Sequence, residues 1–365
     1  MTARLTAAAV LACCVLLPAQ AFAWGASGHR MIGELGIKAL PDDLPAFLRT
    51  PQVVTTVGEL AREPDRWRGA GAAHDSERDN AHFLDLGDDL TVGGGPSLKA
   101  LPPTREDYDS AIRAAGLAAA LRFSTTDASH HPTQYGFGYL PYSIADGWQQ
   151  LARDFIYWRI DAAGETLART DAQRAWFAAD RALHEQLAIH DLGVWAHYVG
   201  DASQPLHVSV HYGEWGAYPN PKGFKPASGL HSRFESAFVH ANIHEDDIAP
   251  LMAKPHSCGC TVRDDVMPEI AGYLATSNSF VVPLFELDAK HAFDAGDPDG
   301  KAFAAARLAA GASELRDMVV DAWRASERMT VGYKVKFGVV KADKDTIEVT
   351  ADTVDRVQTE LGGGD

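Results

Sequence analysis

Side chains that could hold a metal ion recur at a spacing of four residues in two places of this sequence. His197 precedes Asp201 by four positions. The same step separates His231 from Glu235, and His207 lies between the two pairs. In a helix, residues four positions apart lie on one face, so both members of each pair can reach one ion. A single histidine is more often structural, but five ligand-type residues within 39 positions predict a metal centre.

The helices that would carry these residues are long and rich in alanine. Apolar positions at helical spacing predict six helical segments, which are separated by Gly- and Pro-rich loops. The predicted fold class is therefore all-α, with residues 24–328 forming one helical catalytic domain. The predicted helices cover Ser110–Arg122, Ile144–Leu167, Asp171–Val199, Phe234–Ala241, Arg263–Phe285 and Gly300–Glu327.

The last part of the sequence, residues 329–365, has a different pattern. Val331–Val339 and Thr346–Val354 are β-prone, and the KADKD stretch between them is typical of a turn. This pattern predicts a small C-terminal β-hairpin appended to the helical domain. We assign no chemistry to this extension.

The first 23 residues have the pattern of a secretory signal peptide. Arg4 is followed by an apolar run from Leu5 to Leu17, and Ala-Phe-Ala directly precedes Trp24. The apolar run is too short for a transmembrane anchor, so cleavage before Trp24 predicts a secreted or periplasmic protein. The free α-amino group of Trp24, together with its own carbonyl oxygen, could then chelate a metal ion in a five-membered ring.

Cleavage would leave Cys258 and Cys260 as the two remaining cysteines. Two cysteines exclude a disulfide framework for a domain of this size. In an oxidising compartment we expect them to form a small disulfide with a structural role, and free thiols are the alternative.

The sequence is acidic, with 49 Asp and Glu against 33 Lys and Arg and a formal net charge of −16. Loss of Arg4 with the signal peptide would make the net charge −17. Such a chain has no long-range attraction for nucleic acid, so we expect no stable nucleic-acid partner and a monomeric protein. Recognition of phosphate must then be local, and bound dications could supply it. Acidity also keeps an exported protein soluble, which is the simpler interpretation.

Further candidate ligands precede the main cluster. His29 lies in the stretch WGASGHRMIGELG, where Gly25 and Gly28 allow the chain to fold back on itself. Asp65 and His82 are ambiguous from the sequence alone, because Asp65 could be a turn or helix-capping residue and His82 a half-buried side chain.

Several motifs together resemble the superfamily that unites zinc-dependent phospholipase C with the single-strand-specific nucleases of the S-one/P-one type. These motifs are WGASGHRMIGELG, Asp65-x-x-Arg68, AHFLDL, HYVGDASQPLH and GLHSRFE. They occur in family order between Trp24 and Glu235, which is about the N-terminal two thirds of the mature chain. The resemblance implies an all-helical fold that holds three zinc ions in a cleft.

The resemblance also implies which residues hold each zinc ion. Imidazole and carboxylate groups are the expected ligands of catalytic zinc. The implied sets are Asp65, His82, His197 and Asp201 for one ion, His207, His231 and Glu235 for a second, and Trp24, His29 and the bridging Asp201 for a third.

The reaction implied by the resemblance is phosphodiester hydrolysis, in which a zinc-activated hydroxide attacks phosphorus. Arg68 would act as a phosphate clamp in this reaction. Asp65 would assist as a general base in addition to its role as a ligand.

The sequence contains motifs that resemble both branches of the superfamily. The spacing from Trp24 to His29 and the Asp65-x-x-Arg68 motif resemble the nucleases, whereas Glu235 and its HSRFES context resemble the phospholipases. The Gly-Gly-Asn segment typical of the nucleases is replaced by HYGEWGAYPNPKGFKPASG. The leading hypothesis is a phospholipase C. The alternatives are an endonuclease for single-stranded DNA or RNA and a zinc-binding module without catalysis.

Five residues near the expected cleft are candidates for contact with the substrate. Aromatic rings there could stack on bases or surround a quaternary ammonium group, although such rings more often pack loops onto the body of a protein. Asp85 corresponds to a position that contacts a base in the nuclease branch. The candidates are Phe83, Asp85, Tyr135, Tyr212 and Trp215.

Overall fold

A computed structural model of the chain describes residues 24–115, 134–215, 218–225 and 229–363. This part is mostly helical, which confirms the predicted all-α class. The signal peptide predicted over residues 1–23 lies outside the described residues. The helix predicted over Ser110–Arg122 corresponds in its first part to α5 (Arg105–Ala115), and residues 116–122 also lie outside.

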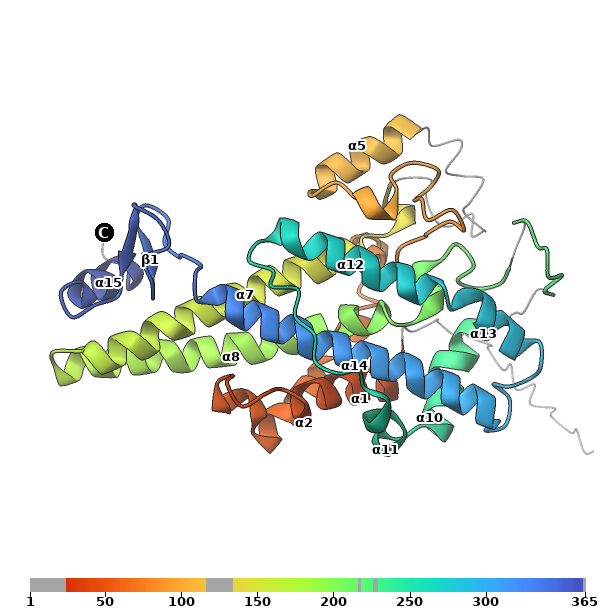
Figure 1. The fold of residues 1–365 in the computed structure, drawn as a ribbon, viewed down its shortest axis with the longest axis horizontal. Coiled ribbons are helices and arrows are strands. Elements are labelled where there is room, and N and C mark those ends of the chain that lie inside the picture. Colours follow the sequence, from red (N-terminus) through yellow and green to blue (C-terminus); the bar gives the residue numbers. More distant parts are fainter. Residues whose placement is uncertain (1–23, 116–133, 216–217, 226–228, 364–365) are drawn as a thin grey trace, which may run out of the picture.

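Two long helices, α7 (Leu140–Leu167) and α8 (Asp171–Asp201), lie side by side as an antiparallel pair (Figure 1). Gly147 of α7 allows this close packing, because a Cβ atom there would lie 2.0 Å from the Trp195 ring of α8. The Trp195 indole also donates a hydrogen bond of 2.9 Å to the Ile144 carbonyl. The C-terminal end of α8 is thereby fixed in the interior of the protein.

Three further helices pack around this end of α8, namely α1 (Ala26–Lys38), α2 (Pro51–Leu60) and α14 (Pro298–Ser326). Their apolar faces belong to one large buried cluster. Helices α1 and α2 were not among the predicted helices. Short elements connect these helices. The short α-helices are α3 (Glu63–Arg66), α4 (Ala72–Ser76), α9 (Leu230–Ser232), α10 (Val239–Asn242) and α11 (Glu245–Ile248).

Several single turns of 3₁₀ or π type complete the helical body. A π-helical turn, η6 (Arg233–Phe238), lies between α9 and α10, so the helix predicted over Phe234–Ala241 is a longer segment with a widened middle. Such turns are frequent at functional sites. The 3₁₀ turns are η1 (Ala46–Arg49), η2 (Asp79–His82), η3 (Leu98–Ala100), η4 (Gln134–Phe137), η5 (Pro205–Val208) and η7 (Ala249–Leu251).

The single helix predicted over Arg263–Phe285 is wrong, because the structure divides it into α12 (Arg263–Asn278) and α13 (Val281–Asp288). Pro283 explains the interruption. Proline has no backbone N–H to continue a helix, but it is tolerated in a first turn, and the break places Pro283 in the first turn of α13.

The predicted C-terminal hairpin is also corrected. Strands β1 (Lys336–Gly338) and β2 (Thr346–Glu348) pair in parallel, and a helix that was not predicted, α15 (Val354–Leu361), follows them. Alternating residues indicate extended segments but not the direction in which they pair. Phe337 and Val354 join a second small apolar cluster at the far end of α7 and α8 (Figure 1).

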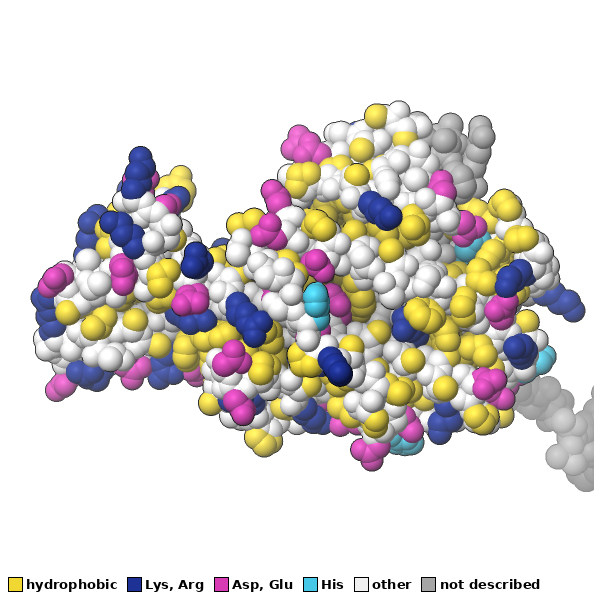
Figure 2. All heavy atoms as spheres, in the orientation of Figure 1, with side chains coloured by type: hydrophobic (Ala, Val, Ile, Leu, Met, Phe, Trp, Pro, Cys, Tyr) yellow, Lys and Arg dark blue, Asp and Glu magenta, His cyan; other side chains and the backbone are white. Residues whose placement is uncertain are grey.

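Two other features concern the surface and the cysteines. Cys258 and Cys260 are joined by a disulfide. Among the described residues, no helix has the length and apolarity needed to cross a membrane. On the face drawn in Figure 2, acidic and basic side chains are interspersed, so the negative net charge does not gather in one patch there.

One buried carboxyl group in the helical pair should make stability depend on pH. Asp154 of α7 is 2% exposed. Burial, together with the nearby charge of Asp191, raises its pKa to about 7. The folded state therefore binds a proton on Asp154 more tightly than the unfolded state does. This proton contributes to the stability of the fold below pH ~4, and the contribution is lost as pH rises through about 7.

We predict that Asp154→Asn becomes more stable than the native protein as pH rises from 4.5 to 8, with a gain on the order of 2 kcal/mol. The measurement is urea unfolding of both proteins at each pH, and only the difference between them is used. The exposed Asp246→Asn serves as the control. A constant difference across this pH range would contradict the prediction.

Candidate metal centre

Eight of the predicted ligand side chains converge in the interior, although they come from six separate parts of the chain. None of them is more than 8% exposed. Helix α8 brings two of them to the centre, and the short elements around its C-terminal end bring most of the others. They are His29 (α1), Asp65 (α3), His82 (η2), His197 and Asp201 (α8), His207 (η5), and His231 and Glu235 (α9 and η6).

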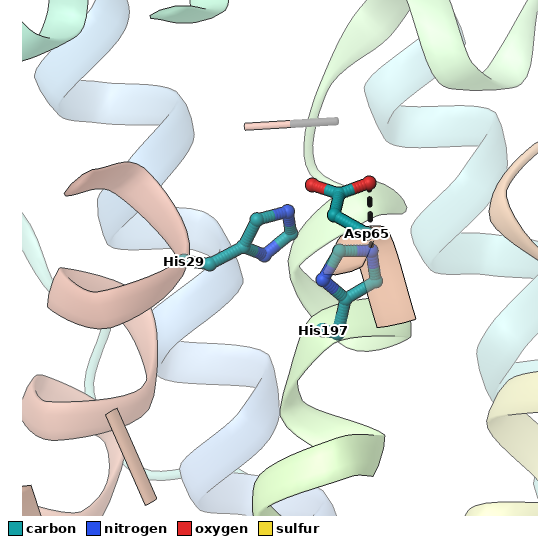
Figure 3. A group of neighbouring side chains, drawn as sticks. All are labelled: His29, Asp65 and His197. Atoms are coloured by element: carbon teal, nitrogen blue, oxygen red, sulfur yellow. Dashed lines mark ion pairs between the residues drawn. The ribbon is translucent and has the colours of Figure 1, made fainter. Parts of the chain in front are cut away.

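The ligand atoms form three groups, within each of which they lie no more than 4.8 Å apart, and the first two groups share His197. Figure 3 shows the first group, in which the His29 and His197 rings and the Asp65 carboxylate lie close together. His197 also belongs to the second group. The three groups are His29, Asp65 and His197, then His82, His197 and Asp201, and finally His207, His231 and Glu235.

The position of His29 differs from the implied set in one respect. Its Nε2 atom lies 3.4 Å from Asp201 Oδ1, as the implied third set requires. The ring also stacks on His197 with 3.8 Å between the ring centroids, which brings His29 into one group with Asp65. The ligand sets that the resemblance implies for the first and third zinc ions are therefore adjacent in space.

Three of the imidazole rings are oriented by backbone carbonyl groups. The Nδ1 atoms of His197, His207 and His231 lie 2.8, 2.7 and 2.7 Å from the carbonyl oxygens of other residues. A carbonyl oxygen can only accept a hydrogen bond, so each Nδ1 carries the hydrogen. In the neutral ring, each Nε2 then has a free lone pair, which is the form that ligates a metal. The accepting carbonyls belong to Ala61, His82 and Tyr212.

These lone pairs point at one another. His207 Nε2 and His231 Nε2 lie 3.0 Å apart, although neither neutral ring has a hydrogen to donate at this atom. Two neutral rings would repel each other at this distance, so the arrangement suits a shared metal ion or a protonated His231, whose Nε2 also lies 2.8 Å from Glu235 Oε2. Burial lowers the pKa of His231, but the charge of Glu235 outweighs burial and raises this pKa overall.

Several buried polar atoms of the centre have no hydrogen-bond partner among the described residues. These atoms include both ring nitrogens of His29, Oδ1 of Asp201 and Oε1 of Glu235. Such groups are costly to bury unless something compensates them. A metal cation would do so, and a donor set of imidazole nitrogens and carboxylate oxygens suits zinc.

Burial also sets the charge state of the side chains. It lowers the pKa of His29 and His82 well below the ordinary value, and that of His197 to about 4, so these rings are neutral at pH 7. Burial raises the pKa of Asp65 to about 6 and that of Asp201 well above its ordinary value. Bound cations would favour the ionised form of both carboxylates.

Two residues that support the centre were not among the predicted site residues. Gln204 donates a hydrogen bond of 2.9 Å to Glu235 Oε2, and Ser203 Oγ accepts one of 2.8 Å from the Trp24 indole. Both belong to the quoted run HYVGDASQPLH, but the spacing of ligand types gives them no signal. Trp24 is fully buried, and Gly25 N–H donates to the Glu235 carbonyl. Chelation by the Trp24 amino group stays a prediction.

Arg68 lies at the edge of the centre. Its guanidinium is 3.2 Å from Asp65 Oδ1 and 2.9 Å from Asp79 Oδ1. Asp65 also lines a cavity of about 770 Å³, to whose wall three further arginines contribute. The cavity therefore combines positive charge with direct access to one of the candidate ligands. These arginines are Arg62, Arg66 and Arg233.

The candidate substrate residues are placed differently from one another. Tyr212 is half-buried, and its carbonyl accepts from His231, so this residue lies beside the centre. Phe83 is also half-buried and follows His82 directly. Their contact with a substrate stays a prediction.

Of the other three candidates, two are buried, and the side chain of the third is not described. Asp85 is buried, and burial raises its pKa to about 8. Trp215 is 4% exposed and stacks on His211 with 3.9 Å between ring centroids, so its ring packs the loop onto the body. The side chain of Tyr135 lies outside the described residues.

Comparisons with known proteins give little further information. No protein-family model and no curated protein matches the sequence. Two solved structures are similar at a low level. The alpha toxin from Clostridium absonum has a TM-score of 0.37 and 12% identity, and covers 82% of this chain and 64% of its own. The Clostridium perfringens alpha-toxin from an avian strain has a TM-score of 0.37 and 15% identity, and covers 85% and 68%. This chain thus spans about two thirds of their length.

The sharing of His197 between two groups gives a prediction about metal content. We expect His197→Ala to lose more than one zinc ion per chain, and His231→Ala to lose one, because His231 belongs to a single group. The measurement is metal analysis of the purified proteins by mass spectrometry. His190→Ala, which removes an exposed histidine of α8, should keep the full content. Equal losses in the two centre variants would contradict the overlapping arrangement.

Proposed function

We propose that the protein is an exported, zinc-dependent phosphodiesterase that holds three zinc ions in the centre described above. The observation that carries this proposal is the 3.0 Å approach of two imidazole Nε2 atoms whose hydrogens lie on the opposite side of each ring. The convergence of eight buried imidazole and carboxylate side chains around this pair favours metal ions over a single shared proton. The pattern of residues 1–23 supports export.

The residues of the chain have separate tasks in this proposal. Zinc, when bound, supplies Lewis acidity that activates water and stabilises the negative charge developing on a phosphoryl group. The carbonyl-bound histidines hold their lone pairs in fixed directions, so little reorganisation is needed. Asp65 lines the cavity and can hold a proton at a carboxylate oxygen. Arg68 places a permanent positive charge beside it.

A phospholipid is the substrate that we favour, with hydrolysis of phospholipase C type. The support comes from the sequence, because Glu235 in its HSRFES context resembles the phospholipase branch and the Gly-Gly-Asn segment of the nucleases is missing. Glu235 is fully buried and accepts from Gln204, as a fixed ligand requires.

The cavity beside Asp65 favours a second candidate. Three arginines in its wall would suit a substrate with several phosphates, such as single-stranded DNA or RNA. Each of these arginines is also close to a carboxylate of this chain, which reduces the positive charge that a substrate would meet. A nuclease of the S-one/P-one type is therefore the alternative.

The proposal predicts turnover of a phosphodiester by zinc-loaded protein that begins at Trp24. We expect release of phosphocholine from phosphatidylcholine to exceed release of nucleotides from a single-stranded oligonucleotide when both are offered at matched concentration. His197→Ala should lower turnover by at least about 10³-fold, and His190→Ala should keep it.

Each outcome of this assay separates the hypotheses. Preferential release of nucleotides would replace the phospholipase proposal by the nuclease. Retained activity in folded His197→Ala would refute the metal assignment. Bound zinc without turnover on either substrate would support a zinc-binding module without catalysis.

A second prediction concerns the N-terminus. If the Trp24 amino group chelates zinc, a variant with one additional alanine before Trp24 should lose about one zinc ion per chain and most of its activity, because the extra residue converts the amine into an amide. Metal analysis and the turnover assay test this. A variant that begins at Trp24 and carries an exchange of exposed Lys344→Ala provides the control. Full metal content in the extended protein would exclude this chelation.

A further inference from the structure

A buried arginine without a partner lies in a separate cavity, remote in sequence from the predicted ligands. Arg307 of α14 is 8% exposed. Two of its three guanidinium nitrogens, Nε and Nη1, are buried without a hydrogen-bond partner among the described residues. A buried charge is normally paired, because removal from water is costly. Burial accordingly lowers the pKa of Arg307.

The surroundings of Arg307 hold its side chain in place. The guanidinium stacks on the Phe280 ring, 3.6 Å from the ring centroid. Ser277, one turn before Phe280, is fully buried, and its hydroxyl also lacks a partner among the described residues. Arg307 and Ser277 both line a cavity of about 350 Å³. A planar guanidinium and a hydroxyl are suitable donors for a carboxylate or phosphate group.

The cavity has a defined wall. It lies between α12 and α14, and the segment between α11 and α12 crosses α14 at this place (Figure 1). Ala253 N–H donates to Ser313 Oγ, and Arg316 donates to the Ala253 carbonyl. Further along, Cys258 N–H donates to Asp321. These bonds fix the segment on α14, so the cavity is a stable feature of the fold.

The other end of the cavity is acidic. Glu269 is exposed, and Glu314 lies seven residues after Arg307 on the same helix, about 10 Å further along its axis. Burial raises the pKa of Glu314 to about 8, and the carboxylates of Asp317 and Glu269 add to this rise. With this pKa, Glu314 mostly holds a proton at pH 7, and an incoming cation would favour its ionised form. Lys254 also lines the cavity but lies on the exposed segment.

From this arrangement we propose that the cavity is a binding site for a small zwitterion. The anionic group of the ligand binds Arg307 and Ser277 at the buried end, and its cationic group binds Glu269 and Glu314 at the open end. A bare anion would be repelled by the acidic end, and a bare cation would leave Arg307 without a partner. The ligand class is therefore an ω-amino carboxylate or a phosphoamine whose charges are separated by several bonds.

Isothermal titration calorimetry on the purified, metal-loaded protein tests this site by binding and not by turnover, and the Arg307 variant below separates it from binding of a carboxylate or phosphate to the metal centre. The probe is 6-aminohexanoate, and hexanoate and hexylamine are the matched ligands that lack one charge. Phosphoethanolamine is a further arm that distinguishes a phosphate from a carboxylate. We expect a zwitterion to bind at least roughly tenfold more tightly than either single-charge ligand.

Two variants assign the ends of the site. Arg307→Met keeps a side chain that can pack on Phe280 but removes the charge, and Glu314→Gln removes the carboxyl group that would ionise beside a bound cation. We expect each to weaken binding by roughly tenfold or more. Arg324→Met, an exposed arginine of the same helix, is the control and should bind as the native protein does. Without ligand, Arg307→Met should melt a few degrees higher, because it removes an unpaired buried charge.

Three results would overturn the proposal. The first is the absence of saturable binding for both zwitterions. The second is equal binding of hexanoate and 6-aminohexanoate, which would leave an anion site without the acidic end. The third is unchanged binding in folded Arg307→Met, and if that variant does not fold, unchanged binding in Glu314→Gln decides the question.

Discussion

The candidate metal centre depends on one constraint, which is that backbone carbonyls hold the Nδ1–H groups of three histidines. His197, His207 and His231 each donate to such a carbonyl, so their Nε2 lone pairs all point inward. The protein thereby fixes the tautomer and the ring orientation before any ion arrives. This arrangement is unfavourable without a cation, because lone pairs of neighbouring rings approach to 3.0 Å. The surrounding fold has to supply the energy that maintains it.

The helical body supplies this energy through its large buried cluster, which surrounds the C-terminal end of α8. Close packing of Trp195 against Gly147 fixes that end, two residues before His197. Most of the remaining ligands lie on short elements that pack against α8 or close to it, and backbone carbonyls orient the rings of His207 and His231. Rigid long helices and short, well-bonded connecting segments thus have complementary roles.

Much of the site could be predicted from the sequence, because residues at a spacing of four on a helix necessarily share a face. His197 and Asp201 are the plainest case. The resemblance to a known superfamily was needed for Asp65 and His82, since chain positions more than one hundred residues apart carry no local signal. Gln204 was missed for a different reason. The role of the Gln204 amide becomes visible only through its hydrogen bond to Glu235, and the spacing of residues in the sequence does not reveal this bond.

The errors in the predicted fold also have physical reasons. Apolar spacing extends through Ser279 and Phe280, so the interruption before α13 depends on Pro283 and not on hydrophobic periodicity. The relative direction of the two C-terminal strands depends on the path of residues 339–345. An alternating pattern of residues does not predict this path. Arg307 could not have been identified either, because an unpaired charge is defined by what surrounds it.

One residue connects two of the candidate metal-binding groups directly. The ring of His82 belongs to the second group, and its backbone carbonyl holds Nδ1 of His207, which belongs to the third. An ion that fixes the His82 ring also restrains this carbonyl and thus the direction of the His207 lone pair. By linkage, occupation of the third group favours the second by the same factor. The two groups should therefore fill cooperatively, and the apoprotein should acquire its ions in concert instead of one after another.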